Sequence, residues 1–209
     1  MIDATGMTGL EARETLHGRV FGSGAVDFLP LPAGGALLLT AAVEARAVSE
    51  PLGRLLGLPV PMQPWQTETH RGRMLHWISP RSWLLSCDQD DEAALAAAVL
   101  RAFPDRCLHA CAQSSRISRF GLRGEGAEDL LRQIGFLALE PGGIVPGGFR
   151  RTLLAGQPTL VWRIGPTEWQ LGVDRDKADH LRGWVLRIMR DEAASDRITA
   201  ITGTQERRA

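Results

Sequence analysis

Apolar residues along this chain fall into short runs and helically spaced sets. The run at 36–45 predicts a strand, the stretch SEPLGRLLG at 49–57 a short helix, and the stretches at 72–79 and 82–87 the two strands of a hairpin. Residues 88–103 begin with acidic side chains, which favour a helix N-terminus, and place four apolar residues on one helix face: Leu95, Val99, Leu100 and Phe103.

The same order of elements is predicted again further along the chain. Residues 116–124 read as a strand, 126–135 as a helix, and 149–173 as three short strands with turns at Gly156 and Pro166. A last helix over 174–189 carries an apolar side made of Leu181, Trp184, Val185, Ile188 and Met189.

An internal sequence repeat relates these two sets of predicted elements. The stretch ISPRSWLLSCD at 78–88 and the stretch IGPTEWQLGVD at 164–174 share Ile, Pro, Trp, Leu and Asp at the same five places, 86 positions apart. Earlier in each half the matching residues lie 78 positions apart, and the connector EPGGIVPGG at 140–148 accommodates the difference. The chain is therefore predicted to contain one structural unit twice.

This repeat predicts an α+β fold of duplicated strand-helix-hairpin-helix modules that form one bilobal domain. The modules cover about residues 35–113 and 114–192. Residues 1–34, in which Pro30 and Pro32 interrupt any regular helix, are predicted to be an extended N-terminal arm, and 193–209 a polar C-terminal tail.

Composition limits the classes of function. The 24 basic and 24 acidic residues balance, so no net field attracts nucleic acid or an anionic membrane. No apolar run approaches the ~20 residues that cross a bilayer, and the acidic N-terminal stretch is unlike a secretory signal. Three cysteines form no disulfide framework. We therefore expect a cytoplasmic protein with no nucleic-acid or membrane partner.

The repeated residues invite a functional interpretation. Trp83 and Trp169 would serve as stacking platforms for a flat ligand, but packing in the core under the following helix is the simpler expectation for an aromatic residue in a strand. Asp88 and Asp174 stand where a helix begins, so we expect them to cap it or to interact with its dipole.

Two further motifs were weighed as ligand sites. CLHAC places Cys107, His109 and Cys111 at alternate positions, which resembles a zinc site without a fourth ligand; buried small residues on a core strand are the expected alternative. GLRGEGAED has two glycines between a strand and a helix, but Glu125 and Glu128 would repel a phosphate. The sequence therefore predicts no catalytic, cofactor-binding or metal-binding residue in this chain.

The second module as a whole resembles a known family. Its pattern is a strand ending at Gly124, the GAEDLL helix, a connector over 141–148, a strand with Arg151, Thr152 and Leu153, a Trp-bearing hairpin and a final helix. In this order the motifs resemble the gamma subunit of heterotetrameric sarcosine oxidase and its relatives, over about residues 36–190.

The resemblance implies a fold like the duplicated first domain of the folate-binding aminomethyltransferase of the glycine cleavage system. Folate-binding relatives have an Asn-Ala-x-Asn segment near the last helix and an acidic pair after the hairpin glycine. This chain contains no Asn, and no acidic residue lies between Gly156 and Trp162. The resemblance therefore implies a chain without a folate site of its own.

By the same resemblance the chain is an accessory, non-catalytic gamma-type subunit of a flavoenzyme that oxidatively demethylates sarcosine or a similar N-methyl amino acid. Its partners would be alpha-, beta- and delta-type subunits. FAD and FMN would be bound by the beta subunit, NAD and tetrahydrofolate by the alpha subunit, and zinc by the delta subunit. N-methylglutamate dehydrogenase uses a similar set of subunits and stays open as the complex.

The apolar stretch VDFLPLP in the predicted arm offers a subunit interface through Phe28, Leu29 and Leu31. One alternative function is a stand-alone folate-dependent one-carbon transferase, which rests on fold analogy. Another is a repair or tRNA-modifying factor of the same fold, which the neutral charge disfavours.

Overall fold

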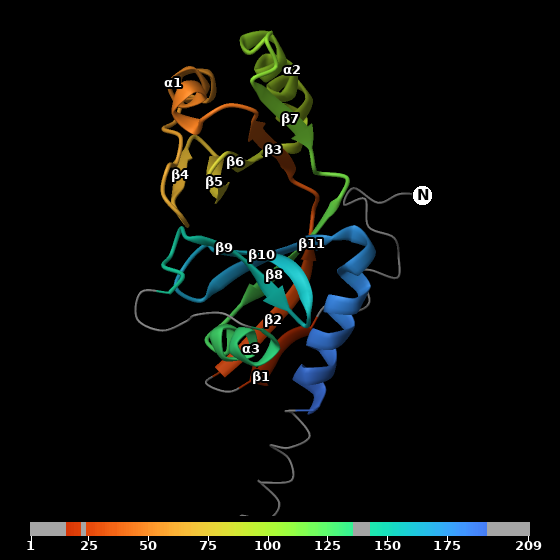
Figure 1. Ribbon diagram of the computed structural model, residues 1–209. Helices are drawn as coiled ribbons and strands as arrows, with labels where there is room; N and C mark the ends of the chain where they lie inside the picture. Colours follow the sequence, from red (N-terminus) through yellow and green to blue (C-terminus); the bar gives the residue numbers. More distant parts are fainter. Residues whose placement is uncertain (1–15, 22–23, 136–142, 192–209) are drawn as a thin grey trace, which may run out of the picture. The chain divides into compact units, whose positions relative to one another are not determined.

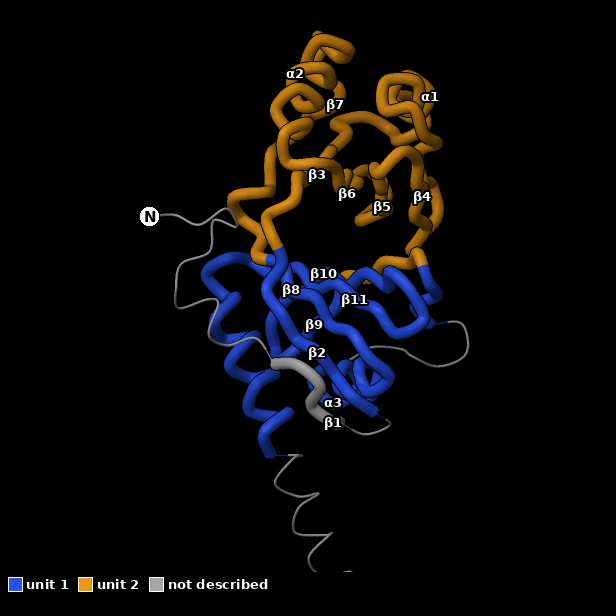
Figure 2. The backbone as a smooth tube through the Cα atoms, turned by 180° about the vertical axis from the view of Figure 1, so that it is seen from behind, with its two compact units in different colours: residues 1–31, 119–146, 152–209 blue, residues 32–118, 147–151 orange. Residues whose placement is uncertain are grey.

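The computed structural model describes residues 16–21, 24–135 and 143–191. The first fifteen residues of the predicted arm and the predicted tail at 193–209 lie outside the described residues. The chain divides into two compact units (Figure 2): residues 1–31, 119–146 and 152–209 form the first unit, and residues 32–118 and 147–151 form the second.

The second unit is a sheet with two helices on one face (Figure 1). Its strands, in spatial order, are β4 (Thr67–His70), β5 (Arg73–Ser79), β6 (Ser82–Cys87), β3 (Gly35–Ala41) and β7 (Leu108–Ala112). The two helices are α1 (Ala45–Leu56) and α2 (Glu92–Ala102). Apolar side chains of both helices and of β3, β5, β6 and β7 form one core, because alternate strand residues point to the helical face.

The first unit has the same architecture with one more strand. The strands of its sheet, in spatial order, are β1 (Leu16–Phe21), β2 (Gly24–Leu31), β8 (Ile117–Arg123), β11 (Glu168–Asp174), β10 (Gln157–Arg163) and β9 (Phe149–Leu154). The first three residues of β9 belong to the second unit. Its core lies between this sheet, helix α3 (Ala127–Ile134) and the helix over 178–191 (Figure 1).

The structure confirms the predicted α+β fold of two equivalent modules. From β3 to α2 the chain forms a strand, a helix, three strands and a second helix, and the same order recurs from β8 to the helix at 178–191. Even the short 3₁₀ turns recur, as η2 (Gln89–Asp91) and η3 (Arg175–Lys177), at the offset of 86 residues found in the sequence. The repeat is therefore present in the backbone as well as in the side chains.

Each module is preceded by a strand that pairs with the other module's sheet. β2 comes directly before β3 in the chain but pairs with β8, antiparallel, with Phe28 opposite Leu122. β7 comes directly before β8 but pairs with β3, antiparallel, with Ala110 opposite Leu39. The two leading strands are thus exchanged between the sheets.

This exchange corrects the predicted arm. Residues 24–31 form a full strand of the first sheet, and Phe28 is 1% exposed and stacks on Phe120 with ring centroids 5.2 Å apart. Phe28 is therefore a core residue and not an interface residue. Leu29 and Leu31 are half-buried and lie over Gly121 on the other face of β2, so an interface role for these two stays a prediction.

Helix α1 also begins earlier than predicted. The sequence placed its start near Ser49, but the helix starts at Ala45, and the Ser49 hydroxyl donates to the carbonyl of Arg46 at 3.1 Å inside it. The reason is burial, because the apolar face of α1 includes Ala45 and Val48, one turn before the predicted start.

Candidate functional site

The two repeated tryptophans are buried. Trp83 and Trp169 are both fully covered, as are Leu85 and Leu171, which lie two residues further along and on the same face. The predicted core packing is confirmed, and neither indole presents a ring to a flat ligand.

The polar atoms of these tryptophans differ between the modules. The indole N–H of Trp83 donates to the carbonyl of Pro61 at 2.7 Å. The indole nitrogen of Trp169 is buried without a hydrogen-bond partner among the described residues, and the guanidinium of Arg163 lies 4.8 Å from its ring centroid. The repeat therefore keeps the packing of the indole but not its hydrogen bond.

This difference predicts unequal effects of the same substitution. Trp83→Phe removes a buried hydrogen bond and leaves the Pro61 carbonyl without its donor, whereas Trp169→Phe removes an N–H that has no partner among the described residues. We expect Trp83→Phe to lower the free energy of unfolding by about 1 kcal/mol more than Trp169→Phe. Urea denaturation of the two variants checks this, and equal losses would contradict it.

The glycine turn at 124–126 is occupied by the protein's own backbone. Gly124 has a φ of +116°, and a Cβ there would collide with the carbonyl oxygen of Ala25 on β2. Its N–H donates to the carbonyl of Thr167 at 2.9 Å. Close approach of three backbone segments thus explains the glycine.

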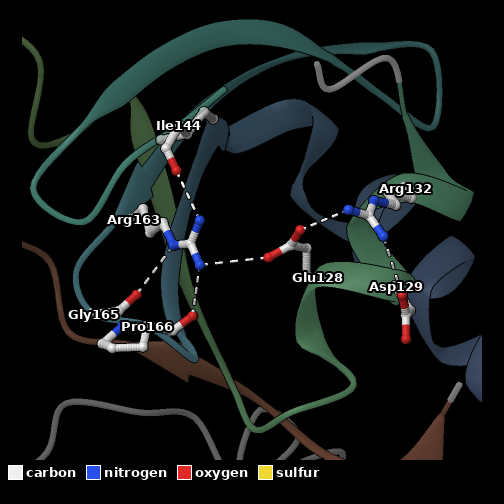
Figure 3. Close-up of polar contacts among 7 residues, drawn as sticks. All are labelled: Glu128, Asp129, Arg132, Ile144, Arg163, Gly165 and Pro166. Carbon is white, nitrogen blue, oxygen red and sulfur yellow. Dashed lines mark hydrogen bonds and ion pairs between the residues drawn. The ribbon is translucent and has the colours of Figure 1, made fainter. Parts of the chain in front are cut away.

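A glutamate on helix α3, just after this turn, binds an arginine (Figure 3). Glu128 on α3 forms an ion pair with Arg163 at 3.4 Å and another with Arg132 at 2.8 Å. The Arg163 guanidinium also donates to three main-chain carbonyl oxygens, those of Ile144 at 2.9 Å, Gly165 at 3.4 Å and Pro166 at 2.9 Å. Arg163 thereby ties the β10–β11 turn to α3, a role that sequence reasoning missed.

Asp88 and Asp174 occupy the predicted positions at the starts of η2 and η3. Neither side chain accepts a hydrogen bond from the turn that follows it. The prediction of a side-chain cap is therefore wrong, and an interaction of Asp88 and Asp174 with the helix dipole stays a prediction. The carboxylate that organises this corner in the second unit is Glu92, four residues after Asp88 and at the start of α2.

Glu92 is a buried carboxylate surrounded by donors. One oxygen accepts main-chain N–H groups from Ala36 at 3.2 Å, Gln113 at 3.1 Å and Ser114 at 3.1 Å. The other oxygen accepts the Ser114 hydroxyl. Burial by itself raises the pKa of this carboxyl, but the four hydrogen bonds outweigh burial and hold the pKa below its ordinary value. The equivalent residue of the other module is Ala178, so this site does not recur.

His76 is buried in the same unit. Its ring is fully covered and stacks on Phe149 with centroids 4.5 Å apart. Its two nitrogens lie 3.1 Å from the Thr67 hydroxyl and 3.4 Å from the Ser86 hydroxyl. Burial lowers the pKa of His76 to about 3, so the ring is neutral at physiological pH. A neutral ring between two hydroxyls is a packing element rather than a site of proton transfer.

The CLHAC motif faces outward. Strand β7 buries Leu108, while His109 and Cys111 are exposed and Cys107 is half-buried. The expectation that these residues are buried on a core strand is therefore wrong, because the alternation of β7 points Leu108 and Ala110 inward instead. Among the residues that the structure describes, no group of three or more His, Cys, Asp or Glu side chains is placed to hold a metal ion.

One leucine on α2 is also unexpectedly exposed. Leu95, Val99 and Phe103 are buried as predicted, but Leu100 is 64% exposed. Its equivalent in the other module, Leu186, is 4% exposed. A hydrophobic residue is therefore covered in one module and uncovered in the other.

No helix within the described ranges has the length and apolar character that crossing a bilayer requires.

Comparison with solved structures identifies the fold. A chain of heterotetrameric sarcosine oxidase from Corynebacterium sp. U-96, in complex with pyrrole 2-carboxylate, superposes with a TM-score of 0.72 at 23% sequence identity, over 87% of this chain and 89% of that one. Aminomethyltransferase T of the glycine cleavage system from Bartonella henselae superposes with a TM-score of 0.55 at 11% identity, over 76% of this chain and 45% of that one.

Comparisons of sequence alone gave a different result. No protein-family model matches the chain, and no curated protein matches it. This chain spans less than half the length of aminomethyltransferase T but nearly the whole sarcosine oxidase chain. The resemblance drawn from the sequence is confirmed at the level of the fold, which is the one shared by these two proteins.

Proposed function

We propose that this protein is an accessory, non-catalytic subunit of a cytoplasmic, heteromeric flavoenzyme of the sarcosine oxidase type. The complex would oxidatively demethylate sarcosine or a similar N-methyl amino acid. The observation that carries this proposal is the end-to-end match with the sarcosine oxidase chain, because 87% of this chain and 89% of that chain superpose. The match with aminomethyltransferase T is partial, because it covers 45% of that chain.

The use of polar residues supports a structural role. Glu92 binds main-chain donors, Arg163 binds main-chain carbonyls, and the repeated tryptophans fill the two cores. Carboxylate, guanidinium and indole groups are those that a catalytic or binding site would use, and here each of them stabilises the fold. In the proposed complex FAD, FMN, NAD, tetrahydrofolate and zinc belong to alpha-, beta- and delta-type partner subunits, and this chain contributes to assembly.

Purification from the native cells tests the proposal. A tagged full-length chain is expected to elute with larger partner chains, at a mass well above its own 22.8 kDa, and with the absorption bands of flavin. The complex is expected to oxidise sarcosine or N-methylglutamate, and the better substrate identifies its class. Recovery of the tagged chain as a lone monomer would contradict the proposal.

Tetrahydrofolate separates this function from the alternative of a stand-alone folate-dependent transferase. The isolated chain is expected to show no change in tryptophan fluorescence up to millimolar tetrahydrofolate. Quenching that saturates in the micromolar range, together with one-carbon transfer by the isolated chain, would favour the transferase instead.

A further inference from the structure

Strand β7 is the outer strand of the second unit's sheet, and no described strand pairs with its far side. The N–H of Ala42 donates to the carbonyl of Cys107 at 2.8 Å, and the N–H of Gln113 donates to that of Ala36 at 2.7 Å. In an antiparallel ladder the bonded pairs alternate. The odd-numbered residues of β7 therefore bond to β3, and Leu108, Ala110 and Ala112 direct their N–H and C=O groups away from the sheet.

A groove of ≈ 390 Å³ runs beside this free edge, between α2 and β7. Its lining is mainly small and apolar, with two basic side chains: Ala96, Ala97, Val99, Leu100, Leu108, Ala110, Arg106 and His109. The lining includes no acidic residue, and it includes Leu100, the leucine that is 64% exposed. The groove is thus suited to apolar side chains accompanied by a carboxylate.

The other module shows what covers such an edge. β2 is the counterpart of β7, and β1 pairs antiparallel with its outer side, as Val20 opposite Ala25. In that module the leucine equivalent to Leu100, Leu186, is buried in the same core cluster as Val26 and Phe28 of β2. Within the described residues the first sheet therefore has six strands and a covered leucine, whereas the second has five strands and an exposed one.

We propose that β7 binds an extended strand of a partner protein, antiparallel, which completes the second sheet. The strand carries apolar side chains at alternate positions, which enter the groove over Leu100. It also carries a carboxylate near its C-terminal end, because Arg106 lies just before the start of β7. A second copy of this chain fits less well, since pairing β7 with itself brings together two grooves that each include Arg106 and no acidic residue. This inference rests on the proposed function only in requiring a heteromeric complex.

A proline variant tests the edge without disturbing the sheet. Ala110→Pro removes an N–H that points away from β3, a position that tolerates proline on an outer strand. The matched control is Thr69→Pro on β4, the outer strand on the opposite side of the sheet. The N–H of Trp77 on β5 donates to the carbonyl of Gln66, so the even-numbered residues of β4 bond to β5. The N–H of Thr69 therefore also points outward. Both variants are made in the tagged full-length chain, and the complex is isolated from native cells.

In the wild-type complex we expect the amides of Leu108 and Ala110 to exchange with deuterium on the order of tenfold more slowly than in the isolated chain. The Ala110→Pro chain is expected to lose its partner, while the Thr69→Pro chain keeps it. A complex that forms without protection at β7, or that survives Ala110→Pro, would overturn this inference and leave the proposed function standing. Protection in the isolated chain that depends on its concentration would assign the edge to a second copy; protection that survives dilution would assign it to another segment of this chain.

Failure to recover a complex would contradict the proposed function. In that case binding of a peptide tests the inference by itself. The probe is acetyl-Thr-Val-Thr-Val-Thr-Glu-amide, and its control carries Lys in place of Glu. We expect the first peptide to bind about fivefold more tightly than the second and to shift the amide resonances of Leu108–Ala112. Equal affinity, or shifts elsewhere than at β7, would overturn the inference.

Discussion

Replacing Glu92 by alanine is expected to lower the free energy of unfolding by about 3 kcal/mol. The carboxylate accepts the main-chain N–H groups of Ala36, Gln113 and Ser114, and these donors lose their common acceptor together. Water reaches them poorly because Glu92 is 8% exposed. The substitution also frees Ser114 from the start of α2, so slow hydrogen exchange at Ser114 is expected to be lost, whereas the N–H of Gln113 keeps the carbonyl of Ala36 as an acceptor.

The matched control for this substitution is Glu50→Ala. Glu50 also lies on a helix and binds Arg54 at 2.8 Å, but its side chain is 77% exposed. An exposed pair of this spacing contributes about 0.3–0.5 kcal/mol, so the control is expected to change stability by no more than that. Urea denaturation of both variants measures the difference. Similar losses in the two would show that the donors around Glu92 find other acceptors.

Acid is expected to destabilise the protein through His76. Its pKa is 6.5 in the unfolded chain and about 3 in the folded one, so between these values the unfolded state binds the extra proton. The free energy of unfolding therefore falls as the pH falls, by about 1.4 kcal/mol per pH unit in that window and by about 4 kcal/mol across it. Above pH 6.5 the ring is neutral in both states and this effect ends.

Two histidine variants separate this effect from other acid-sensitive groups. His76→Gln is expected to flatten the slope between pH 6.5 and 5, whereas His70→Gln, at an exposed position of the same hairpin, leaves the slope unchanged. Glu92 acts at lower pH, because its lowered pKa makes its stabilisation disappear only as the pH falls below 4.5. Equal slopes in wild type and His76→Gln would show that the ring does not control acid stability.

The repeated corners made the fold predictable from sequence. Trp and Leu spaced two apart on a strand, followed by an acidic residue and a helix, give the same local structure wherever they occur, and both copies are buried as predicted. Strand β2 was not predicted, because Pro30 and Pro32 indicated an extended arm without regular secondary structure. Among the described residues β1 pairs with β2 as far as Phe28, so the missing N–H of Pro30 interrupts no described ladder on that side.

The polar sites could not be predicted in the same way. Glu92 reads as one more acid at a helix start, and its donors lie 21 and 22 residues away at Gln113 and Ser114. Arg163 binds the carbonyl of Ile144, 19 residues away. Leu100 fits the apolar face of α2, yet it is 64% exposed. These outcomes depend on pairings between distant segments, which periodicity along the chain does not report.

The exchange of leading strands sets an order for folding during synthesis. All five strands of the second sheet have emerged from the ribosome by Ala112, so that sheet has every β-partner it needs by then. β2 emerges before these strands, yet its edge that faces β8 has no partner until Leu122 has been made. This apolar strand, with Val26 and Phe28, therefore joins its own sheet only after the strands of the second sheet are available. A chain cut between β7 and β8 keeps the second sheet complete and leaves β2 as an apolar edge prone to aggregation.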